Sequence, residues 1–208
     1  MKRKLVALMA LLAGLALAQT TDPTRDEHTV TVNIPPILRL SLDATQYLFD
    51  FTVGDVDDPV QNNSLGFPKA SQAAYGAFLD DESKTTQLFA PTSIAGTSND
   101  YGTLRINTNQ AQWVVNIDTI ESNLATPLSN NRLKVHAVKD TGKGSSLTGG
   151  PGSMALAADT AIIQATSDGQ GRSVYKLYYL LEMNINDAFP NASDYSSTIT
   201  VNLLLTTP

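Results

Sequence analysis

Three aspartates close together in residues 54–59 are the side chains whose type and spacing come nearest to a set of metal ligands. Asp55, Asp57 and Asp58 offer three carboxylates within four positions. Calcium is a hard cation that prefers oxygen ligands, and such a group suits it. The stretch lacks the alternating ligands and the closing glutamate of an EF-hand loop, so a solvated acidic turn is the alternative. Calcium is the only cofactor that the sequence suggests.

Residue types that usually carry out catalysis are few and poorly placed. The histidines are His28 and His136, and neither belongs to an H-E-x-x-H pattern. Because the chain has no cysteine, a zinc site would need carboxylate ligands. The pair Ser145-Ser146 lies in a glycine-rich loop, without the strand-to-helix turn of a G-x-S-x-G nucleophile. We therefore expect no catalytic residue and no enzyme, and we expect His136 on the outward face of a strand.

Aromatic side chains allow two readings, a stacking platform for sugars or part of a core. Trp113 opens a strand-like alternation with Val115 and Ile117, which favours a core position. Tyr175 and Tyr179 share one face of a regular strand and Tyr178 falls on the other, so these three cannot form one stripe.

The first 18 residues predict export. Basic residues at positions 2–4 precede an apolar run over 5–17, and Ala16-Leu17-Ala18 forms a small-residue cleavage site. This is the pattern of a secretory signal peptide. The run has about 13 apolar residues, fewer than the roughly 20 needed to span a bilayer, and no later segment reaches that length. We expect cleavage after Ala18, no membrane span afterwards, and a location in the periplasm, at the cell surface or outside the cell.

Composition narrows the function classes. Removing the signal peptide takes three of the 14 basic residues and none of the 20 acidic ones, which leaves 11 against 20 and a net charge of −9. This argues against nucleic acid as a partner. With no cysteine there are no disulfides, so stability must come from packing and hydrogen bonding.

Period-two alternation of apolar and polar residues recurs along the mature chain and predicts an all-β fold. We expect an arm over 19–28 and a single sandwich domain over 29–208, with a long insertion at about 54–100 that holds short strands or a helical turn near 70–78. About eight or nine strands and no crossover helices favour an immunoglobulin-like or jelly-roll β-sandwich. The expected strands cover residues 29–34, 37–42, 47–53, 102–108, 112–120, 132–138, 161–165, 173–185 and 197–205, and 141–152 is expected to be a flexible loop.

Three segments resemble secreted sandwiches of the spore coat protein U and fimbrial-subunit type. These are Leu48-Phe49-Asp50-Phe51, the stretch 108–113 leading into a strand, and the closing stretch 194–203. The chain has Asp50 and Ser197 where those proteins commonly have glycine and aspartate, and it lacks their cysteines. The resemblance implies a non-enzymatic subunit of a pilus, coat or surface layer.

The same resemblance gives a role to residues 29–34. This segment alternates, with Val30, Val32 and Ile34 on one side, and Pro35-Pro36 separates it from the domain. It is a candidate donor strand that completes the sheet of a neighbouring subunit, or else it pairs within its own domain. The sequence thus predicts an exported structural protein that assembles with itself or with other surface components. A secreted carbohydrate- or calcium-binding module is the alternative.

Overall fold

The computed structural model describes residues 30–122, 128, 130–189 and 199–208. The chain divides after Ile34, and residues 35–208 form one folded unit that holds every helix and strand of the described part. The expected signal peptide, the arm over 19–28 and residues 194–198 of the closing motif lie outside the described residues.

The prediction of an all-β fold is confirmed. Twelve strands and one α-helix occur in the described part of the chain, and several of the strands have only two to four residues. Such short strands carry no alternation signal, which is why the sequence suggested fewer. The strands are β1 (Leu38–Leu42), β2 (Gln46–Leu48), β3 (Thr86–Phe89), β4 (Ser93–Ala95), β5 (Gly102–Thr108), β6 (Trp113–Ser122), β7 (Leu133–Thr141), β8 (Ser145–Ser146), β9 (Met154–Ala155), β10 (Thr160–Ala165), β11 (Gly171–Asn184) and β12 (Ile199–Thr206).

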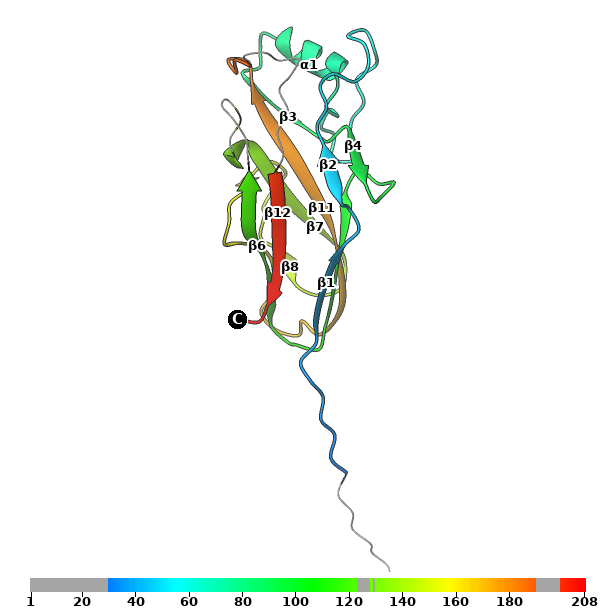
Figure 1. The fold of residues 1–208 in the computed structure, drawn as a ribbon, viewed down its shortest axis with the longest axis vertical. Coiled ribbons are helices and arrows are strands. Elements are labelled where there is room, and N and C mark those ends of the chain that lie inside the picture. Colours follow the sequence, from blue (N-terminus) through cyan, green and yellow to red (C-terminus); the bar gives the residue numbers. More distant parts are fainter. Residues whose placement is uncertain (1–29, 123–127, 129, 190–198) are drawn as a thin grey trace, which may run out of the picture. The chain divides into compact units, whose positions relative to one another are not determined.

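The strands form a sandwich of two main antiparallel sheets (Figure 1). The first sheet has the order β1-β5-β11-β7-β9, with β3 pairing the far part of β11, and the second has the order β12-β6-β10-β8. Strands β2 and β4 form a small separate pair. Whether the sandwich is immunoglobulin-like or a jelly roll stays a prediction.

The core lies between the two sheets. Leu104, Ile106 and Leu177 from the first sheet and Trp113 and Ile117 from the second are all fully buried. The indole Nε1 of Trp113 donates a hydrogen bond to the Gly169 carbonyl at 2.8 Å. A buried tryptophan needs such a partner for its N–H. The interpretation of Trp113 as a core residue is confirmed.

The region expected as a long insertion contains a helix and short strands, as predicted. Helix α1 (Gln72–Leu79) begins after Ser71, whose side chain accepts a hydrogen bond from the Ala74 N–H. The strand expected over 47–53 is wrong in its second half, because the chain turns after Leu48. The Asp50 carboxylate accepts hydrogen bonds from the N–H and the hydroxyl of Thr52, and this Asx turn ends the strand.

The glycine-rich stretch 141–152 is anchored, and the prediction of a flexible loop is wrong there. Ser173 Oγ accepts a hydrogen bond from the Lys143 N–H at 2.8 Å, and the Tyr175 hydroxyl donates to the Lys143 carbonyl at 2.7 Å. Gly144 adopts a positive φ of 79°, and a Cβ there would lie 2.8 Å from Trp113. Glycine is needed at this position because the loop closes over the core.

Candidate interaction surfaces

Residues 30–34 are exposed along their whole length. They adopt neither helix nor strand, and the side chains of Val30, Val32 and Ile34 are 73%, 72% and 72% exposed. Exposed apolar side chains that alternate along a segment are costly in water unless a partner covers them. The expectation that this segment pairs as a strand within its own domain finds no counterpart in the described residues.

One side of the sandwich is bounded by two end strands. Strand β1 ends the first sheet and β12 ends the second, and the two strands lie beside each other, running in opposite directions (Figure 1). Within the described part of the chain, each end strand therefore has one row of backbone N–H and C=O groups without a sheet partner. The inward side chains of these two strands are only partly buried, in contrast to the central strands, and they are Leu40, Leu42, Ile199, Val201, Leu203 and Leu205.

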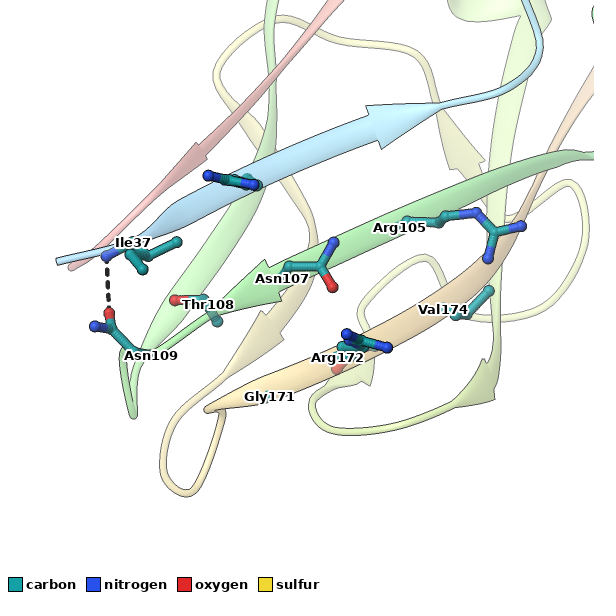
Figure 2. Close-up of a pocket in the computed structure, with 10 residues that line it drawn as sticks. Ile37, Arg105, Asn107, Thr108, Asn109, Gly171, Arg172 and Val174 are labelled. Atoms are coloured by element: carbon teal, nitrogen blue, oxygen red, sulfur yellow. Dashed lines mark hydrogen bonds between the residues drawn. The ribbon is translucent and has the colours of Figure 1, made fainter.

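A hollow of about 680 Å³ opens on the outer face of the first sheet, over β1, β5 and β11 (Figure 2). Arg39, Asn107 and Arg172 form a row across it, since Asn107 faces Arg39 in one strand pair and Arg172 in the other. Two strand spacings separate the outer arginines by about 10 Å at the backbone. Arg105 lies two residues before Asn107 on the same face. We call this hollow, which Arg39, Arg105 and Arg172 line, the arginine groove.

The arginine groove is a cationic area without internal compensation. All three arginines are exposed, and none of the described residues that line the hollow is an aspartate or glutamate. Within the described part of the chain, no ion pair or side-chain hydrogen bond involves Arg39, Arg105 or Arg172. The chain as a whole is acidic, with 20 acidic and 14 basic residues. An unpaired cluster of cations on such a protein is suited to hold an anion.

The groove lies at the end of the sandwich where the folded unit begins, which we call the Asn109 end (Pro35, Ile37, Asn109 and Gly171). The Asn109 side chain accepts a hydrogen bond from the Ile37 N–H at 2.8 Å and donates one to the Pro35 carbonyl at 2.9 Å. These two bonds fix the start of the domain against the turn between β5 and β6. Residues 35–37 are therefore held beside the groove.

The predicted calcium ligands are not brought together. Asp58 turns back to accept a hydrogen bond from the Asp55 N–H at 2.9 Å, as in a simple acidic turn. Among the described residues, no three His, Cys, Asp or Glu side chains gather closely enough to hold a metal ion. The structure thus gives no support to a site formed by Asp55, Asp57 and Asp58.

His136 lies on the outer face of β7, as expected, but it is not open to solvent. Its side chain is only 8% exposed, and its Nδ1 lies 3.3 Å from the hydroxyl of Thr148, in the loop that covers it. Burial lowers the pKa of His136 below its usual value. Strand alternation predicted the outward direction of His136, but it says nothing about a loop that returns over the sheet.

The tyrosines follow the predicted faces. Tyr175 and Tyr179 are buried in the core, whereas Tyr178 packs on the outer face, where its ring lies 5.4 Å from that of Tyr101. The Tyr178 hydroxyl lies 3.1 Å from Ser64 Oγ, in the region expected as an insertion. With Trp113 also buried, none of these rings provides an exposed platform for a sugar.

The three arginines of the groove were not recognised from the sequence. Arg39 and Arg105 occupy polar positions in expected strands, which indicates an outward direction, and Arg172 directly precedes the strand expected over 173–185. Their positions are more than 60 residues apart, so only the pairing of β1, β5 and β11 brings them together.

The comparisons with known proteins leave the assignment to the chain itself. The chain matches no protein-family model, and neither the search of curated proteins nor that of solved structures gave a match. Among the described residues, no helix has the length and apolar character needed to cross a membrane. The resemblance to coat and fimbrial subunits therefore stays a hypothesis.

Proposed function

We propose that this protein is an exported, non-enzymatic structural subunit that assembles with copies of itself at the cell surface or outside the cell, as a pilus, coat or surface-layer subunit does. In this assembly, residues 30–34 of one copy add as a strand to the open side of the next copy. Main-chain hydrogen bonds supply affinity in this mode, and alternate side chains fill apolar positions.

The observation that carries this proposal is the exposure of Val30, Val32 and Ile34 in a segment that has no strand partner among the described residues. Fully burying one such side chain contributes about 1.5–3 kcal/mol. The side of the sandwich between β1 and β12 offers what the segment lacks, namely two free strand edges and partly covered apolar side chains. If the chain leaves its domain without reversing, residues 30–34 do not return to the open side of their own domain. They can then pair only with the open side of another copy.

Pro35-Pro36 supports a strand that reaches away from its own domain. Proline fixes φ near −65°, and the residue before a proline is held in extended conformations. Ile34 and Pro35 both precede a proline, which disfavours a tight reversal at this point. Complementation by a second copy is therefore favoured over folding back.

The alternative of a carbohydrate- or calcium-binding module has weaker support. The aromatic rings that would stack on a sugar are buried, and the three aspartates do not converge. The proposal of a structural subunit needs none of these residues.

The test is the mass of the protein from Gln19 onwards, measured by size-exclusion chromatography with light scattering over a range of concentrations. We expect high-mass species that disappear in Val32→Asp, because this change places a carboxylate in an apolar position. Thr31→Asp adds the same charge on the opposite side of the strand and is the matched control. A wild-type monomer at all concentrations, or equal behaviour of the two variants, would contradict the proposal.

A further inference from the structure

We infer that the arginine groove binds the acidic arm of a second copy of this chain, so that Asp22, Asp26 and Glu27 of one subunit lie against Arg39, Arg105 and Arg172 of the next. This inference rests on the proposed function. It adds ion pairs between copies to the apolar contacts of residues 30–34. It gives the groove a partner whose sequence is known.

Charge complementarity is the first argument. Residues 19–29 contain Asp22, Asp26 and Glu27 against a single Arg25, so the arm is a short anionic segment. The groove offers three guanidinium groups, no acidic side chain in its lining, and no ion pair within the described residues. Guanidinium groups bind carboxylates through charge-assisted, often bidentate hydrogen bonds.

Direction is the second argument. In a chain of identically oriented copies, the arm leaves one domain at its Asn109 end and enters the next copy from the opposite end. Followed from Ile34 back to residue 22, the arm then runs toward the Asn109 end of that next copy. In the usual N-to-C direction it is therefore parallel to β1 and antiparallel to β12, whose directions Figure 1 shows. Residues 22–29 continue past the strand and arrive where the arginine groove opens.

Reach is the third argument. Eight extended residues span about 26 Å. The groove is three strands wide, and the distance from β1 to β11 is about 10 Å. From a Val30 that pairs beside the Asn109 end of β1 in the next copy, the segment 22–29 is therefore long enough to cross β1 and to place its carboxylates over Arg39 and Arg172.

The lining of the groove also favours a peptide over a neutral sugar. Its side chains include three arginines, Asn107 and Val174, and none of its described residues is aromatic. Base or sugar stacking needs such rings. An acidic polysaccharide shares the carboxylate chemistry of the arm, and it is one outcome of the test.

The first experiment reverses charges in the full exported protein. We expect Arg39→Glu/Arg172→Glu to raise the concentration needed for assembly at least tenfold, and Asp26→Lys/Glu27→Lys to do the same. The chain that carries all four substitutions restores opposite charges between positions 26–27 of one copy and positions 39 and 172 of the next, and it should assemble within about threefold of the wild type. Lys69→Glu/Lys84→Glu, which changes the same number of charges outside the groove, is the control and should assemble normally.

A second experiment uses the absence of cysteine from the chain. In Glu27→Cys/Arg172→Cys, mild oxidation should give a ladder of disulfide-linked multimers, whereas each single-cysteine variant forms dimers at most. A cross-linked monomer would show that the arm folds onto its own groove and would overturn the inference. Each Cys variant has wild-type residues elsewhere and can be checked for folding by circular dichroism.

The outcomes separate this inference from the proposed function. If Val32→Asp abolishes assembly while Arg39→Glu/Arg172→Glu leaves it unchanged, the strand proposal stands and the groove inference fails. If the wild type stays monomeric, both fail. A third outcome is that the wild type binds polygalacturonate, whereas Arg39→Glu/Arg172→Glu loses this binding and assembles normally. The groove would then bind an acidic polysaccharide, and the inference would be overturned.

Discussion

Two groups of basic side chains lie on the outer face of the first sheet, and their surroundings are opposite. Toward the far end of β11, Arg132 lies 3.0 Å from Asp187 and 3.8 Å from Glu182, and Lys134 lies 3.6 Å from Glu182. At the Asn109 end, none of the described residues that line the arginine groove is acidic. We call Arg132, Lys134, Glu182 and Asp187 the closed network. The three arginines of the groove, which have no acidic partner among the described residues, are the open group.

The difference teaches how to separate a structural charge from an available one. Arg132 and Asp187 are 21% and 5% exposed, so each has lost much of its hydration and depends on its partner. The arginines of the groove keep their water and depend on nothing in the described fold. Substitutions in the first group should therefore affect folding, and substitutions in the second should affect binding.

The largest effect is expected for Asp187→Ala. This change removes the partner of Arg132 and the acceptor of the Asn184 N–H, which Asp187 binds at 2.8 Å. Leaving a partly buried charge and a backbone donor without partners should lower the free energy of unfolding by about 2 kcal/mol. Urea unfolding followed by Trp113 fluorescence measures it. Asp140→Ala is the control, because Asp140 is an exposed residue 3.7 Å from Lys176. A loss as small as that of the control would show that the network is not structural.

A second prediction concerns His136, which marks the part of the same face that a loop covers. Burial lowers its pKa in the folded protein below the value of 6.5 for a free histidine. The unfolded chain therefore binds more protons at mildly acid pH, and the contribution to stability is complete above pH 6.5 and is lost as the pH falls below it. We expect the stability of wild type to fall faster than that of His136→Asn between pH 7 and pH 5.

The measurement for this prediction is the urea midpoint at each pH. His28 is present in both proteins and cancels in the difference. Parallel pH profiles of the two proteins would show that His136 is as solvated as a free histidine, and that the loop around Thr148 does not cover it in solution.

The sequence predicted the elements of the covered core better than those of the surface. Alternation in residues 102–108 and 173–185 identified β5 and β11 because burial on one face imposes a period of two. Trp113 was assigned correctly for the same reason. The short β8 and β9 were not found, since two residues carry no period.

The groove and the cover of His136 were beyond prediction because both depend on contacts between distant segments. The outward direction of Arg39 and Arg105 follows from their own strands, but their neighbourhood follows from which strands pair. The environment of His136 depends on Thr148, whose glycine-rich surroundings suggested a flexible loop. The local sequence pattern predicts the face of the strand on which a side chain lies. Its neighbours depend on which distant segments pack together.

A smaller effect is expected for Glu182→Gln, a change to the residue that bridges Arg132 and Lys134 in the closed network. Glu182 is 31% exposed, and its distances of 3.6 Å to Lys134 and 3.8 Å to Arg132 are those of loose ion pairs. Such pairs contribute little, so the free energy of unfolding should fall by about 0.5 kcal/mol. The loss should shrink further in 0.5 M NaCl, because salt screens partly exposed charges. A larger loss of unfolding free energy than that of Asp187→Ala would show that Glu182, and not Asp187, contributes most to the stability of the network.

The smallest effect on stability is expected for Arg172→Ala in the open group. Two unit charges 10 Å apart in water repel by about 0.4 kcal/mol, so removing one of three unpaired arginines costs no attraction and relieves some repulsion. We expect the free energy of unfolding to stay within about 0.5 kcal/mol of wild type, whereas Arg132→Ala lowers it clearly in the same urea assay. A comparable loss in both variants would mean that Arg172 has a structural partner, and the loss of assembly in groove variants would then report on folding. An unchanged stability makes the same substitution a clean probe of binding, because whatever it alters in assembly must come from the contact that the open arginines make with a partner.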